Sequence, residues 1–107
     1  MMPMIPRTAF TQQLWTAIFT LYRKINQSHW KVPSYDEVIV QLDNEGAYTF
    51  TGGKSSVLTI IQHDMEMEIH FVQTITDTAS ALQQQLQQMK HQFESELAEL
   101  VKHAQGR

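Results

Sequence analysis

The stretch that decides the fold runs from residue 64 to residue 100, where DMEMEIHF at residues 64–71 is followed by LQQQLQQMKHQFESELAEL at residues 82–100. In the first segment apolar residues occupy every second position from Met65 to Phe71, which is typical of a strand with one buried face. In the second, apolar residues recur at three- and four-residue steps, which is typical of a helix. The change of period, which no Gly or Pro marks, predicts a strand followed by a long helix.

The N-terminal part of the chain shows the helical period as well. Apolar residues three and four positions apart predict a helix over residues 8–27, after a short extended tail at residues 1–6 that contains Pro3 and Pro6. A second apolar stripe, with Trp15, Phe19 and Tyr22, lies beside the first one. The resulting apolar arc is wider than one core requires, so we expect this helix to have two neighbours.

Between the two helices, β-branched and aromatic residues predict four strands, at residues 38–42, 47–51, 57–61 and 65–72. The residues Asp43 to Gly46 are predicted to join the first two as a hairpin, because Gly is available for a positive φ. The alternative is that residues 56–104 are mostly helical, since Leu58, Ile61 and Met65 also lie on a helical stripe.

These patterns predict an α+β fold with an N-terminal helix, an antiparallel meander of about four strands and a long C-terminal helix. The alternative fold is mostly α with one β-hairpin. A chain of 107 residues is long enough for one core, so residues 1–107 are predicted to form a single domain.

Composition and charge limit the classes of function. Hydrophobic residues make up 42% and charged residues 18% of the chain, and the net charge is -3. The absence of cysteine excludes disulfides, thiolate nucleophiles and Cys-based zinc sites, and it favours a cytoplasmic location. The sequence has no long apolar run and no stripe of Lys and Arg, so we expect neither a membrane nor a nucleic acid as partner.

The segment Gly52-Gly53-Lys54-Ser55 ends like a phosphate-binding loop. The full pattern requires a Gly at the position of Tyr48 and a helix after the loop, whereas the residues that follow are predicted to form a strand. We therefore expect a turn here, and we predict no cofactor.

The densest set of possible metal ligands is His63, Glu66, Glu68 and His70. On a strand, Glu66, Glu68 and His70 share one face, whereas on a helix His63, Glu66 and His70 do so. A polar row opposite an apolar row is more often the solvated side of a half-buried sheet, so these four residues are weak candidates.

A second set of residues with possible ligand-binding character follows the first helix. His29, Trp30 and Tyr35 lie close together in the sequence and are able to line a pocket at the end of that helix. The alternative is that these three residues are exposed loop residues, because a loop without a pocket would show the same sequence pattern.

The function that the sequence favours is a non-enzymatic protein-binding module of the adaptor, small-chaperone or inhibitor type, acting as a homodimer. One face of the predicted sheet is left for a partner, and the expected partner-binding residues are apolar side chains of the two helices: Trp15, Phe19, Tyr22, Leu86, Met89 and Phe93. In size, acidity and element order the chain resembles the small dimeric chaperones of type III secretion, although it lacks their inserted second helix and later strands. The alternative is a small-ligand or metal-binding protein, possibly a small enzyme.

Overall fold

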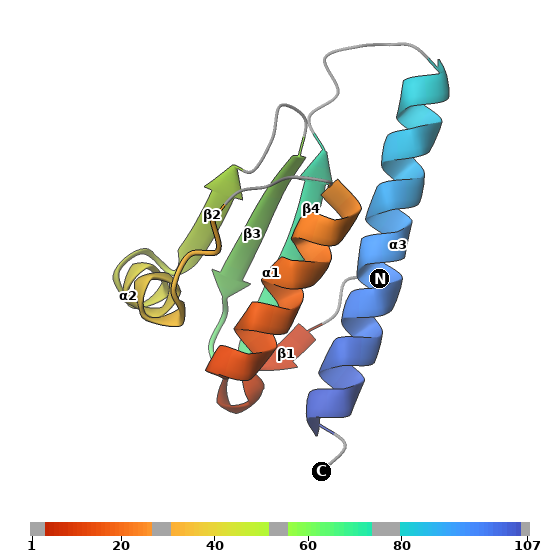
Figure 1. Cartoon of the computed structure of the whole chain (residues 1–107). Helices are drawn as coiled ribbons and strands as arrows, with labels where there is room; N and C mark the ends of the chain where they lie inside the picture. The colour runs from red at the N-terminus through yellow and green to blue at the C-terminus, as the bar shows by residue number, and fades with distance from the viewer. Residues whose placement is uncertain (1–3, 27–30, 52–55, 74–79, 106–107) are drawn as a thin grey trace.

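The computed structural model describes residues 4–26, 31–51, 56–73 and 80–105 (Figure 1). In chain order these residues form the following elements: strand β1 (Met4–Pro6), a single 3₁₀ turn (Arg7–Ala9), helices α1 (Gln12–Asn26) and α2 (Tyr35–Glu45), strands β2 (Ala47–Thr51), β3 (Ser56–Gln62) and β4 (Glu66–Gln73), and helix α3 (Ser80–Gln105). The predicted α+β class is therefore confirmed.

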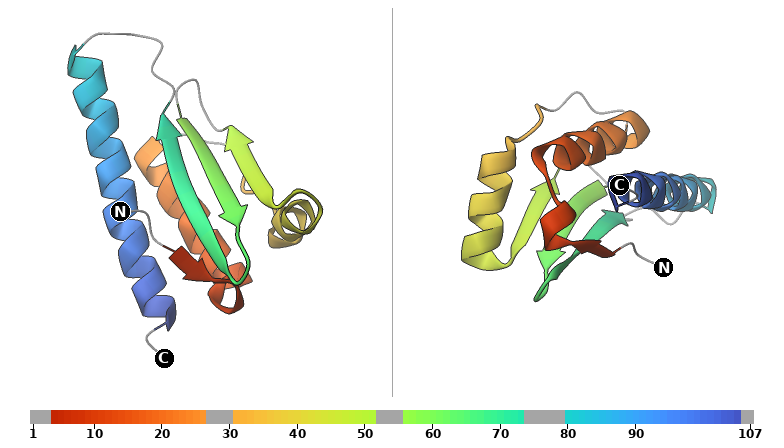
Figure 2. Two further views of the ribbon diagram at one scale, coloured as in Figure 1. Left: turned by 180° about the vertical axis from the view of Figure 1, so that it is seen from behind. Right: turned by 90° about the horizontal axis from the view of Figure 1, so that it is seen from below.

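The four strands form one antiparallel sheet in the order β1-β4-β3-β2. Helices α1 and α3 lie side by side over one face of this sheet, and α2 lies beside the beginning of β2 (Figures 1 and 2). No described helix or strand lies over the other face (Figure 2, left). We call this uncovered face the open face.

Helix α1 begins after Thr11, whose side-chain Oγ1 accepts a hydrogen bond from the N–H of Leu14 over 3.1 Å. This bond satisfies one of the N–H groups that a helix start leaves without a partner. The predicted second stripe of α1 is buried against aromatic rings of the sheet: Trp15 meets Tyr48 edge-on at 5.8 Å between ring centroids, and Phe19 meets Phe50 edge-on at 4.8 Å. The two neighbours expected for α1 are thus the sheet and α3.

Residues 38–42, predicted as a strand, form part of helix α2 instead. Ser34 caps this helix, since its Oγ accepts a hydrogen bond from the N–H of Glu37 over 3.1 Å. Val38 and Leu42 are buried one turn apart, whereas Val40 is 57% exposed. A strand would place all three side chains on one face, so helix capping and packing outweigh the β-preference of the Val and Ile residues.

Gly46 has the positive φ that the sequence suggested, but in a different setting. With a φ of 75° it ends α2, and its N–H donates to the carbonyl of Leu42 over 2.8 Å. It is the left-handed residue of a helix C-terminus and not the turn of a hairpin.

The fourth strand comes from the predicted N-terminal tail. Met4–Pro6 pairs with β4, with Met4 opposite Glu68 and Pro6 opposite Glu66. Residues 1–3 lie outside the described residues. A three-residue strand carries too little periodicity to be recognised in the sequence, and two prolines nearby argued against it.

The mostly helical alternative for residues 56–104 is wrong, because Ser56–Gln62 and Glu66–Gln73 are paired strands. They are joined by a tight turn in which the N–H of His63 donates to the carbonyl of Glu66 over 2.9 Å. Helix α3 follows and buries Phe93, Leu97 and Val101, which are four residues apart, on α1 and β4.

Candidate functional site: the open face of the sheet

The open face is lined by rows of side chains that the strand register places opposite one another. One row contains Ala47, Ile61, Glu68 and Met4, each from a different strand. Alternate residues of a strand point to opposite faces, and Ile60, Met67 and Ile69 are buried toward the helices. The next row contains Thr49, Thr59 and His70.

Most of the open face is apolar or carries hydroxyl groups. Ala47, Val57, Thr59 and Ile61 are half-buried, although no described element lies over them. Met4 is 38% exposed, and Met65, in the turn before β4, is 71% exposed. The four strands contain no Lys and no Arg.

A polar cluster, formed by His63, Glu68 and His70, interrupts this surface. The carboxylate of Glu68 lies between the two imidazoles: its Oε1 accepts a hydrogen bond from Nε2 of His63 over 2.8 Å, and its Oε2 lies 2.5 Å from Nε2 of His70. The second contact lacks the alignment of a hydrogen bond, so the buried Nε2 of His70 has no hydrogen-bond partner among the described residues. The cluster places a carboxylate, held between two imidazoles, among apolar neighbours.

The two imidazoles change the acidity of Glu68. The hydrogen bond from His63 is the largest cause of a lowered pKa of Glu68, burial opposes it, and the charge of His70 lowers the pKa further. Glu68 therefore stays ionised in mildly acidic solution.

Of the four predicted metal ligands, the structure brings together His63, Glu68 and His70. Glu66 lies on the same strand, is exposed and takes no part in the cluster. Within residues 4–26, 31–51, 56–73 and 80–105, no set of three or more His, Cys, Asp or Glu side chains is placed to hold a metal ion. Metal binding by these residues stays a prediction.

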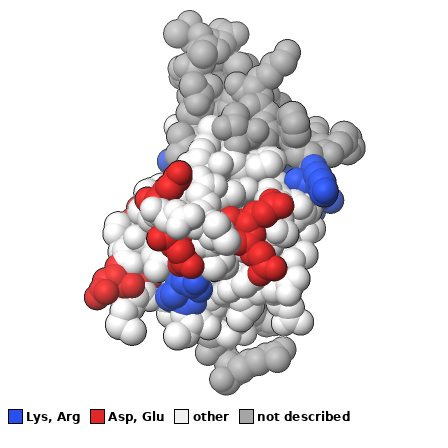
Figure 3. Space-filling view, turned by 90° about the vertical axis from the view of Figure 1, so that its left-hand side faces the viewer, with Lys and Arg blue, Asp and Glu red and all other residues white. Residues whose placement is uncertain are grey.

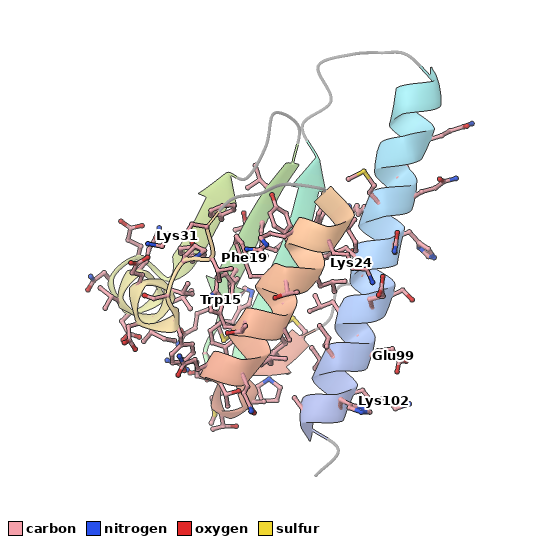
Figure 4. All side chains as sticks on the ribbon, viewed as in Figure 1. Trp15, Phe19, Lys24, Lys31, Glu99 and Lys102 are labelled. Atoms are coloured by element: carbon pink, nitrogen blue, oxygen red, sulfur yellow. The ribbon has the colours of Figure 1, made fainter. Side chains whose placement is uncertain are left out.

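The predicted partner-binding residues lie mainly in the core. The side chains of Trp15, Phe19, Tyr22 and Phe93 are 0–1% exposed, and Met89 is half-buried. Figure 4 shows Trp15 and Phe19 projecting from α1 toward the strands. In this conformation the four buried side chains are covered within the chain itself, and partner binding by the predicted residues stays a prediction. The side chain of Leu86 lies outside the described part.

The pocket suggested by His29, Trp30 and Tyr35 falls largely outside the described residues, which omit positions 27–30. Tyr35 is described, and its hydroxyl donates a hydrogen bond to the carbonyl of Phe10 over 2.8 Å. That bond gives Tyr35 a structural role between the start of α1 and the start of α2.

Two hollows lie away from the open face. A trough of about 590 Å³ between α1 and α3 is lined by Ala17, Thr20, Leu21, Glu96, Glu99, Leu100 and His103. A second hollow of about 480 Å³ lies on α2 around the exposed Val40 and includes Asp36, Glu37 and Glu45. Acidic side chains gather on this side of the molecule (Figure 3).

Burial also affects Tyr48, which lies on the helix side of β2. Loss of solvent raises its pKa to about 12, and the negative charge of Glu37 adds to the effect. Tyr48 is therefore neutral at any physiological pH.

Met4, Thr59 and Ile61 were not among the residues predicted to form a site. The alternation in Val57 to Ile61 would have placed Thr59 and Ile61 together on the face opposite Leu58 and Ile60. Met4 had no such signal, because β1 is recognised only through its pairing with β4.

Comparison with known proteins gives no family. No family model, no curated protein and no solved structure matches the chain. The resemblance to type III secretion chaperones thus receives no support from solved structures. Among the described residues, no helix has the length and apolar character needed to cross a membrane.

Proposed function

We propose that the chain is a non-enzymatic protein-binding module, of the adaptor, small-chaperone or inhibitor type, that acts as a homodimer and contacts its partner protein through the open face. The single observation that carries this proposal is the uncovered second face of the sheet, with its apolar and hydroxyl side chains. An antiparallel sheet with one solvated face normally carries polar residues there, whereas this face contains Val57, Ile61 and Met4.

The charged side chains of the open face indicate which kind of partner it binds. Its central carboxylate, Glu68, lies between His63 and His70, and the strands bring no Lys or Arg. A nucleic acid gains nothing from such a surface, since phosphates require cationic side chains. A largely apolar protein surface fits it, provided that the exposed carboxylate of Glu66 stays solvated or meets a cationic group of the partner.

The size of the face supports action as a homodimer. Four strands of three to eight residues, at about 3.3 Å per residue and about 4.8 Å between strands, give a face of roughly 400 Å². A stable protein interface buries about 800 Å² on each partner. One open face therefore supplies about half of the usual area, and two faces side by side supply all of it.

The experiment that tests the proposal is native mass spectrometry of protein purified gently from its own host, comparing wild type with Thr59→Arg. Thr59 lies in the middle of the open face, so an arginine there introduces an unmatched charge without entering the core. Gln13→Arg, at an exposed position of α1, is the matched control.

We expect wild type and Gln13→Arg to carry the same additional polypeptide and Thr59→Arg to lose it, with circular dichroism showing that both variants are folded. A polypeptide that stays bound to folded Thr59→Arg, or a wild-type protein that carries only a small ligand or a metal ion, contradicts the proposal.

A further inference from the structure

Strand β2 forms one edge of the sheet, and its hydrogen bonds show which backbone groups point outward. The N–H of Gln62 donates to the carbonyl of Gly46 over 2.8 Å, so Gly46 points toward β3. Backbone groups alternate in direction along an antiparallel strand, so Tyr48 and Phe50 also bond to β3. The N–H and C=O groups of the three residues between and beyond them therefore point away from the sheet: Ala47, Thr49 and Thr51.

This outer row of backbone groups has no hydrogen-bond partner among the described residues. Thr49 is exposed, and Ala47 is half-buried where α2 lies beside the beginning of the strand (Figure 1). The side chain of Thr49 lies 3.5 Å, Oγ1 to Oγ1, from Thr59 on the open face and does not cover the edge.

The two edges of the sheet differ in how they are protected. Native proteins protect edge strands by making them short, by placing charges, prolines or bulges in them, or by covering them with a helix or loop. Strand β1 has only three residues and ends in Pro6. Strand β2 has five residues, no charge and no proline, and its register with β3 is unbroken from Ala47 to Thr51. Helix α2 lies beside the beginning of β2 only, so the edge from Thr49 onward is the less protected of the two.

We propose that β2 pairs antiparallel with the β2 strand of a second copy, about a twofold axis at Thr49. The inference rests on the proposed homodimer and specifies its contact. The two Thr49 residues exchange N–H···O=C bonds, and Ala47 pairs with Thr51 of the partner subunit.

The sequence of the strand favours a second copy as the occupant. Ala-Tyr-Thr-Phe-Thr has a nearly palindromic pattern, so the pairing sets Tyr48 opposite Phe50 of the partner subunit and a small residue opposite a small residue. Aromatic pairs across strands are favourable, and like charges opposite one another, which would oppose self-pairing, are absent. Phe50 is half-buried at this edge, so it still has surface to bury.

The pairing joins the two sheets into one of eight strands with one continuous open face. Two faces of roughly 400 Å² then provide roughly the 800 Å² of a standard interface. Self-association and partner binding thus use different parts of the sheet, an edge and a face.

The test is sedimentation equilibrium of wild type, Thr49→Pro and Thr49→Val. Proline removes an outward N–H and leaves the bonds of Tyr48 and Phe50 to β3 in place, so the monomer is expected to fold. Valine changes the side chain and keeps the backbone donor. We expect wild type and Thr49→Val to be dimers and Thr49→Pro to dissociate at least tenfold more readily. Should circular dichroism show that Thr49→Pro is unfolded, Thr49→Lys, which places like charges opposite one another, replaces it with the same expected result.

Amide hydrogen exchange gives a second readout. In the dimer the amides of Ala47, Thr49 and Thr51 are expected to exchange slowly, and on dilution to monomer they become fast while those of Tyr48 and Phe50 stay protected. A wild-type dimer that persists in the folded edge variant, or that is lost in Thr49→Val, overturns the β2 pairing and leaves the homodimer itself standing. A wild-type protein that is monomeric at all concentrations overturns both.

Discussion

The indole Nε1 of Trp15 donates a hydrogen bond to the carbonyl oxygen of Pro33 over 2.8 Å, across 18 residues of sequence. The bond ties the segment before α2 to the first turn of α1. Together with the bond from the Tyr35 hydroxyl to the Phe10 carbonyl, it fixes the position from which α2 runs toward the start of β2. The placement of α2 beside the sheet thus depends on two side chains that donate to main-chain carbonyls.

Removing either donor is expected to weaken the fold. Tyr35→Phe deletes only a hydroxyl and should lower the free energy of unfolding by about 1 kcal/mol. Trp15→Phe also leaves the carbonyl of Pro33 without its partner and should cost about 1–3 kcal/mol. Urea unfolding followed by circular dichroism measures both. Values unchanged from wild type in both variants would show that the two bonds do not hold α2.

The aromatic stripe of α1 is expected to govern stability. Phe19 is fully buried against Trp15, Tyr22 and Phe50, so Phe19→Ala should lower the free energy of unfolding by about 3–5 kcal/mol. The control is Val40→Ala on the exposed side of α2, which should change it by no more than about 0.5 kcal/mol. If Phe19→Ala were as stable as wild type but unable to bind its partner, Phe19 would instead belong to the partner-binding surface.

The cost of replacing Gly46 is expected to depend on how readily the new residue adopts a positive φ. A Cβ at this position would meet no atom within 4 Å, so the cost of substitution is conformational only. Gly46→Ala should lower the free energy of unfolding by about 1 kcal/mol, and Gly46→Asn by less, because Asn adopts the left-handed conformation more readily. Thermal unfolding of the two variants gives the order, and an alanine variant as stable as wild type would contradict this explanation.

The cluster around Glu68 predicts a dependence of stability on acid. Because the folded pKa of Glu68 is below its ordinary value of 4.5, the ionised carboxylate stabilises the fold. That contribution is complete above pH 4.5 and is lost as the pH falls through the folded pKa. Wild type should therefore lose more free energy of unfolding than Glu68→Gln between neutral pH and about pH 3.

The matched control for Glu68 is Glu66→Gln, on the same strand but outside the cluster. Its stability should fall with pH as that of wild type does. Equal acid sensitivity of wild type and Glu68→Gln would show that His63 and His70 do not stabilise the carboxylate.

The sequence patterns predicted helices α1 and α3 and strands β2 to β4, because each of these elements repeats its apolar period over enough residues to be recognised. The α+β class follows from these elements. The patterns placed residues 38–42 in a strand because β-branched residues dominate there, while the capping by Ser34 and the C-terminal role of Gly46 outweigh that preference. The patterns also grouped His63, Glu68 and His70 among the metal candidates, and the strand turn brings these three together.

The sequence by itself determined the periods, and with them which side of each long element is buried, since apolar spacing follows directly from helix and strand geometry. Only the tertiary structure decided that Trp15, Phe19 and Tyr22 are covered by the sheet, that Met4–Pro6 completes it and that one face and the β2 edge remain open. These features depend on contacts between residues that are far apart in the sequence. No local sequence pattern determines the free energy of such contacts.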